Sequence, residues 1–131
     1  MRSTLWQVTP FTCYRWPISF MTTAGGAVAQ DPGSAYMLAY DAARQACVGL
    51  LAQQGLRPTT RGGHVAVDQA VVAQFGSHFR VFGVLRKRRN ELEYPEYPDA
   101  EATIEEAEES LDLAAGIISS AERLLPELGF F

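Results

Sequence analysis

The chain has 131 residues, of which 47% are hydrophobic and 20% are charged. This length fits one domain with a core of modest size, and the composition excludes an intrinsically disordered chain. No apolar run approaches the roughly 20 residues that a transmembrane helix needs.

The formal net charge of −4 hides a strong segregation of charge along the chain. Residues 32–89 hold eight basic side chains against two acidic ones, a net of +6, whereas residues 90–131 hold twelve acidic side chains against one arginine, a net of −11. Such asymmetry predicts a charged partner, either a polyanion or a protein of opposite charge.

Cysteine is sparse, with Cys13 and Cys47 only. Two cysteines do not make a disulfide framework or a zinc site, so we expect reduced thiols, with Cys47 buried on a helix. The sequence implies no metal and no cofactor.

Residues 1–30 are predicted to be an N-terminal arm, extended or partly disordered, ahead of a helical domain at residues 31–131. The segment has no acidic side chain, and polar residues interrupt its apolar ones too often for the ~7–15-residue core of a signal peptide. We therefore expect a cytoplasmic protein. Three interpretations of the segment stay open: a disordered tail, a short arm with breaks at Pro10 and Pro17, or translated sequence upstream of a usual start at Met21.

Apolar spacing near 3.6 residues predicts four helices, over residues 34–54, 64–75, 78–94 and from 99 or 103 to 125. Ser34 and Ser77 are the expected N-caps of the first and third helices, and Thr103 opens a capping-box pattern at the fourth. Pro95 and Pro126 are the expected stops of the third and fourth helices. Short connections without a convincing strand predict an all-α fold, a four-helix antiparallel bundle.

The densest positive charge lies near the end of the third predicted helix, in Arg86, Lys87, Arg88 and Arg89. Arg89 falls on or next to the apolar face of that helix, unlike a typical solvated arginine. One interpretation is an RNA- or phosphate-binding cluster. The structural alternative is that Arg89 forms a salt bridge with Glu93, one turn away, while Arg86, Lys87 and Arg88 are a solvated face.

The fourth predicted helix is acidic in its first half, and residues 91–112 carry ten acidic side chains and no basic one. Acidic side chains there favour the helix dipole and can serve solubility alone. They can also form a partner-binding surface that enters the basic groove of another protein in place of RNA phosphates. The candidate partner-binding residues are Glu101, Glu105, Glu106, Glu108, Glu109 and Asp112.

The pair Arg89-Asn90, near the end of the third long helix, resembles the active-site motif of the HEPN superfamily. The tyrosine- and alanine-rich first helix and the glycine-rich loop before His64 are similar too, and the resemblance covers roughly residues 34–126. It implies a small helical bundle, usually a dimer. Many HEPN proteins are RNA-cutting toxins, and they commonly pair with nucleotidyltransferase-type partners in prokaryotic two-component modules.

The sequence departs from this motif at the histidine that follows the arginine by four to six residues, because Tyr94 stands there. A histidine with a pKa near ~6.5 can act as acid or base at neutral pH, whereas a tyrosine with a pKa near ~10 is a poor base. The only histidines, His64 and His78, each begin a helix far from Tyr94 in sequence. Tyr94 has a structural alternative as a core residue.

We therefore expect a catalytically degenerate HEPN-like protein, an antitoxin or accessory partner that binds and neutralises a nucleotidyltransferase-type toxin. Two alternatives stay open. The first is a metal-independent RNase toxin with Arg89, Asn90 and Tyr94, or a recruited histidine, in its site. The second is a non-catalytic dimer that binds RNA or nucleotide through residues 86–89.

Overall fold

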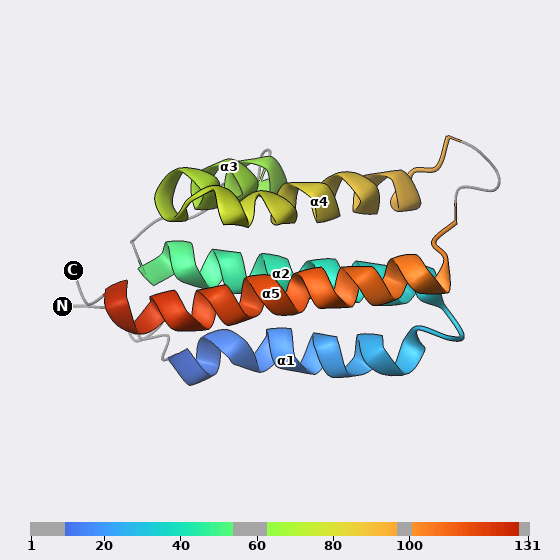
Figure 1. The fold of residues 1–131 in the computed structure, drawn as a ribbon, viewed down its shortest axis with the longest axis horizontal. Coiled ribbons are helices and arrows are strands. Elements are labelled where there is room, and N and C mark those ends of the chain that lie inside the picture. Colours follow the sequence, from blue (N-terminus) through green and yellow to red (C-terminus); the bar gives the residue numbers. More distant parts are fainter. Residues whose placement is uncertain (1–9, 54–62, 97–100, 129–131) are drawn as a thin grey trace.

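The computed structural model describes residues 10–53, 63–96 and 101–128, and over these residues all regular structure is helical (Figure 1). This confirms the all-α class for the described part of the chain. Five α-helices and one short 3-10 turn follow one another: α1 (Pro10–Ala27), α2 (Pro32–Gln53), α3 (Gly63–Phe75), the turn Ser77–Phe79, α4 (Arg80–Glu93) and α5 (Ile104–Leu128). Four helices were expected, and α1 is the additional one.

Helix α2 is the centre of the fold and contacts each of the other four α-helices. Ten of its residues are buried, five of them alanines, and they cover about half of its circumference. Such a broad apolar face must be covered by neighbouring helices, and alanine lets those helices approach closely. Figure 1 shows α1 on one side of the α2–α5 pair and α3 with α4 on the other.

The N-terminal segment is helical from Pro10 to Ala27, so the prediction of an extended or partly disordered arm is wrong for these residues. Pro10 occupies the first helical position, where its missing N–H is not needed. Pro17 lies inside the helix instead of breaking it, and the cost of its lost hydrogen bond is offset by burial of its ring. Phe20 and Met21 pack against the main core. A separate N-terminal unit at residues 1–30 stays a prediction.

Helix α2 begins two residues before the expected start, because Asp31 provides the N-cap in place of Ser34. The Asp31 carboxylate accepts hydrogen bonds from the backbone N–H and the hydroxyl of Ser34, at 3.1 and 2.6 Å. Pro32 then takes the first helical position, which suits its fixed φ. These two hydrogen bonds lower the pKa of Asp31, because both favour the charged carboxylate.

A short 3-10 turn joins α3 to α4, and α4 begins later than the sequence predicted. Gly76 has φ 104°, a left-handed conformation that glycine adopts without strain, and Ser77–Phe79 form a 3-10 turn before α4 begins at Arg80. No side chain caps either start, so the expected N-cap at Ser77 is wrong.

Helix α5 begins as expected and ends later than expected. The Thr103 hydroxyl accepts a hydrogen bond from the Glu106 N–H at 3.0 Å, which confirms Thr103 as the N-cap. The helix continues through Pro126 to Leu128, so the expected stop at Pro126 is wrong. A proline removes one backbone hydrogen bond, and the rest of this long helix holds that turn in place.

Candidate functional site

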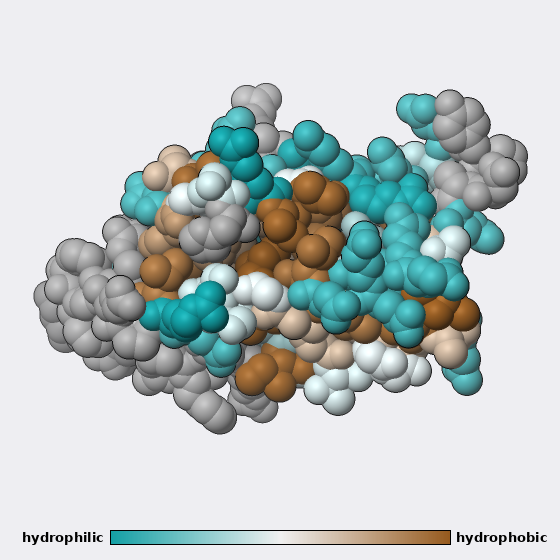
Figure 2. Space-filling model, viewed as in Figure 1, coloured by the Kyte–Doolittle hydropathy of each residue, from teal (hydrophilic) through white to brown (hydrophobic). Residues whose placement is uncertain are grey.

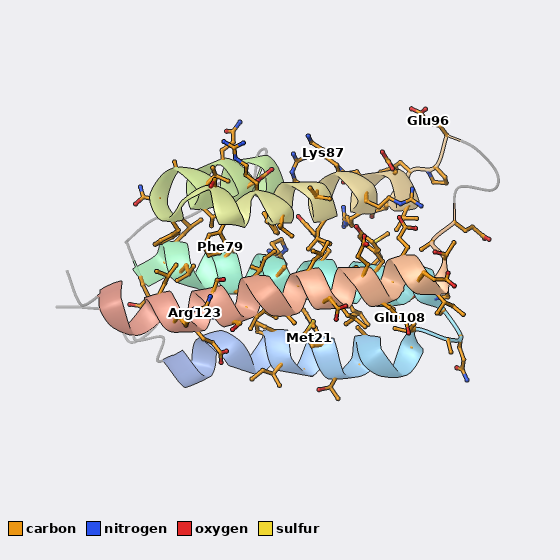
Figure 3. All side chains as sticks on the ribbon, viewed as in Figure 1. Met21, Phe79, Lys87, Glu96, Glu108 and Arg123 are labelled. Atoms are coloured by element: carbon orange, nitrogen blue, oxygen red, sulfur yellow. The ribbon has the colours of Figure 1, made fainter. Side chains whose placement is uncertain are left out.

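Helix α4 carries the predicted basic cluster, and three of its four basic side chains face other parts of the chain. Arg86 points towards α3, Arg88 towards α5 and Arg89 towards α2. Lys87 is exposed, and in Figure 3 it lies on the side of α4 away from α5. The cluster therefore splits into three internal contacts and one outward cation.

Arg86 forms an ion pair with Asp68 of α3 that is largely shielded from solvent. Its Nε and Nη2 atoms both donate to Asp68 Oδ2, at 3.2 Å each. Gly83, one turn earlier on α4, makes room for this carboxylate. A Cβ added there would stand 2.8 Å from Asp68 Oδ2.

Arg88 joins α4 to the start of α5 through a two-point ion pair with Glu106. Arg88 Nε donates to Glu106 Oε2 at 2.5 Å and Arg88 Nη2 donates to Glu106 Oε1 at 3.0 Å. Arg88 Nη1 also donates to Glu91, at 3.1 Å. The hydrogen bonds that Arg88 donates to Glu106 raise the pKa of Arg88 above its usual value. A guanidinium held by two carboxylates has little capacity left for an external phosphate.

Arg89 lies against the core, as its position on the apolar stripe predicted. Its guanidinium carbon is 5.6 Å from the centre of the Tyr40 ring, and Nη1 pairs with Glu93 one turn later on α4. The other contact of Nη1 is a long hydrogen bond, 3.4 Å, to Asn90 Oδ1. The salt-bridge alternative for Arg89 and Glu93 is confirmed.

Of the three residues that were expected as a solvated face if they bind no ligand, Lys87 alone is exposed to solvent. The solvated-face alternative is wrong for Arg86 and Arg88, because both are bound by carboxylates from other helices. Each arginine is 18 residues away from its acid in the sequence, so no spacing within one helix predicts either ion pair. Asp68 and Gly83, which complete the α3–α4 contact, were missed for that reason.

Tyr94 lies at the end of α4, five residues after Arg89. It is the C-cap of α4, and its side chain is 72% exposed, so the core alternative is wrong. The backbone N–H of Tyr94 donates a hydrogen bond to the Asn90 carbonyl at 2.9 Å. The side chains of His64 and His78 lie outside the described residues. Among the described residues, the carboxylate that contacts Arg89 is that of Glu93.

The acidic residues at the start of α5 differ sharply in their surroundings. Glu106 is partly buried and bound to Arg88. The other five are exposed and make no ion pair within the described part of the chain: Glu101, Glu105, Glu108, Glu109 and Asp112. We call these five residues the acidic surface. Glu108, labelled in Figure 3, lies on the side of α5 away from α4.

Comparison with protein-family models, with curated proteins and with solved structures finds no match in any of the three. None of the helices within residues 10–53, 63–96 and 101–128 combines the length and apolar character that crossing a membrane requires.

Proposed function

We propose that this protein is a non-catalytic binding protein, the antitoxin or accessory half of a prokaryotic toxin–antitoxin module. In this proposal the acidic surface docks onto a basic groove of a nucleotidyltransferase-type toxin. The observation that carries it is the unequal use of charge: Arg86, Arg88 and Arg89 of the basic cluster are paired inside the chain, whereas the acidic surface is exposed and unpaired among the described residues.

The chemistry of the acidic surface supports a basic protein as the ligand. Four carboxylates on the first turns of α5, with Glu101 just before the helix, create a negative potential that repels RNA and attracts a groove that holds phosphates. Such charge complementarity speeds encounter and makes binding sensitive to salt. The class of the partner and the antitoxin role come from the resemblance of Arg89-Asn90 to the HEPN motif.

The test is a charge reversal on the purified protein. The tagged chain captures its partner from native cell extract, and the partner is then produced separately for binding measurements. Glu105→Lys with Glu108→Lys is expected to weaken binding about tenfold or more, mainly through slower association, because two attractive contacts become repulsive. Raising the salt concentration should reduce the difference in affinity between the variant and the wild type, because salt screens the charges.

Glu122→Lys is the matched control, because Glu122 is also exposed on α5 but lies outside the acidic surface. It should leave affinity nearly unchanged. Equal affinity of the wild type and the Glu105→Lys, Glu108→Lys variant would rule out docking through the acidic surface.

The two alternatives predict different outcomes of an RNA assay. RNA cleavage by the purified protein, lost on Arg89→Ala, would replace the proposal with the RNase function. RNA binding without cleavage, reduced by Lys87→Ala and falling steeply with salt, would replace it with the nucleic-acid-binding function. The exposed position of Lys87 is the observation that favours the second alternative.

A further inference from the structure

An apolar groove runs between α4 and α5 on one face of the molecule. It has a volume of about 230 Å³, and its lining residues are Phe79, Val81, Asp112, Leu113, Gly116, Ile117 and Ser120. Val84, one turn after Val81, is 59% exposed. Figure 2 shows apolar side chains in the middle of this face with hydrophilic ones around them.

Gly116 leaves the α5 side of this groove open. A Cβ built at Gly116 would have no atom within 4 Å, so the backbone of α5 is accessible to another helix at this point. Ser120, one turn later, is also small. Close approach of two helices requires such small side chains at the crossing point.

Two charged residues of opposite sign lie equally far from Gly116, one on each side, while Asp112 between them lines the groove itself. Glu109 lies seven residues before Gly116 and Arg123 seven residues after it, and both are exposed. Seven residues are about two helical turns, so all three residues lie along one stripe of α5. Glu109 and Arg123 are roughly 21 Å apart along the helix, at 1.5 Å per residue, and do not reach each other within one copy.

Neither charge is neutralised within the described residues. Arg123 donates to the hydroxyls of Ser119 and Ser120, at 3.1 Å each, and meets no carboxylate there. Glu109 belongs to the unpaired acidic surface. The stripe therefore carries an apolar groove at its centre, an unpaired anion on one side and an unpaired cation on the other.

We propose that this face is an interface between two copies of the chain, in which two α5 helices cross antiparallel at Gly116. A two-fold axis through the crossing places Arg123 of each copy opposite Glu109 of the other copy, because both are seven residues from the axis. The same operation covers both grooves and the exposed Val84. This proposal does not rest on the proposed function, since it concerns the purified chain alone. Glu109 and Asp112 of the acidic surface lie at this interface, which leaves Glu101, Glu105 and Glu108 for the partner of the proposed function.

The test is a charge swap followed by sedimentation equilibrium across a dilution series. The wild type is expected to be a dimer at high concentration. Glu109→Arg and Arg123→Glu are each expected to raise the dimer dissociation constant about tenfold or more, because each makes two repulsive contacts per dimer. The double variant should return to near the wild-type value, and rescue requires contact between copies because the two residues do not meet within one.

Gly116→Trp tests the crossing point independently, because the open space at Gly116 accommodates a large side chain in the monomer but not in the dimer. It should give a folded monomer with unchanged helical circular dichroism, and Glu122→Lys should remain a dimer. A wild type that is monomeric at the highest concentration overturns the proposal. A dimer that is insensitive to the two single reversals, or that the double variant fails to restore, overturns it as well.

Discussion

Tyr40 is the side chain against which Arg89, the arginine of the proposed motif, is placed. Its ring is fully buried, stacks on Phe82 with the ring centres 5.3 Å apart, and receives the Arg89 guanidinium. Burial raises the pKa of Tyr40 to about 12, although Arg44 and Arg89 act in the opposite direction. Tyr40 is therefore a neutral aromatic platform for a cation at physiological pH.

This raised pKa predicts a loss of stability at alkaline pH. The folded state holds the Tyr40 proton up to about pH 12, whereas the unfolded chain releases it near the ordinary value of 10.0. Below pH 10 the protonated Tyr40 makes its full contribution to the free energy of unfolding. This contribution, about 2–3 kcal/mol, is lost as the pH rises from 10 towards 12. Urea denaturation between these pH values measures it.

Tyr40→Phe is the comparison that isolates this group, because burial raises the pKa of Tyr36 to about 12 as well, so both tyrosines titrate in that range. The variant should show a shallower fall of unfolding free energy with pH. An identical pH dependence in wild type and variant would contradict the assignment to Tyr40.

At the scale of elements, separate ion pairs join α4 to α3 and to α5. The contact between α4 and α3 also requires a glycine at position 83. Asp68 lies over Gly83 because it is fixed there by two hydrogen bonds from Arg86. A methyl group at Gly83 therefore meets a carboxylate that does not turn aside without losing its partner.

Gly83→Ala is expected to lower the free energy of unfolding by about 1–3 kcal/mol, because overpacking outweighs the better helix propensity of alanine. Thermal unfolding followed by circular dichroism measures the change. Gly26→Ala in α1 is the control, since a Cβ there meets nothing within 4 Å, and it should be neutral or stabilising by up to about 1 kcal/mol. Equal effects of the two substitutions would show that the α3–α4 approach is not tight.

At the scale of the whole molecule, α1 is part of the packed body. It contacts α2 and α5, and Ala24 and Val28 are buried in a small cluster with Ala35 and Ala107. This packing bears on Met21 as an alternative start, because a chain beginning there lacks the first half of α1.

A chain that begins at Met21 is expected to be less stable than one that begins at Pro10, which keeps α1 whole. Loss of the buried Pro17 ring and of the packed Phe20 removes on the order of 3 kcal/mol of apolar burial and uncovers the alanine-rich face of α2. Urea denaturation of the two chains measures the difference. Equal unfolding midpoints would show that the first half of α1 contributes no stability.

Much of the fold follows from local pattern. The strict apolar spacing of α5, the Thr103 cap and the positions of α3 and α4 were predictable, because periodicity and capping are properties of neighbouring residues. The missed features are of another kind. α1 contains two prolines and an irregular apolar pattern, and only its burial against α2 makes a helix the favoured conformation.

The candidate site divides in the same way. Sequence alone established the basic cluster and the acidic run. It also predicted the apolar position of Arg89 and offered the Arg89–Glu93 pair as an alternative, since both depend on spacing within one helix. Tertiary structure decided that Arg86 and Arg88 are bound by Asp68 and Glu106, that Tyr94 is exposed, and that five acidic side chains remain unpaired. The physical reason is that ion pairs between helices depend on how helices pack, and no local pattern of residues encodes that arrangement.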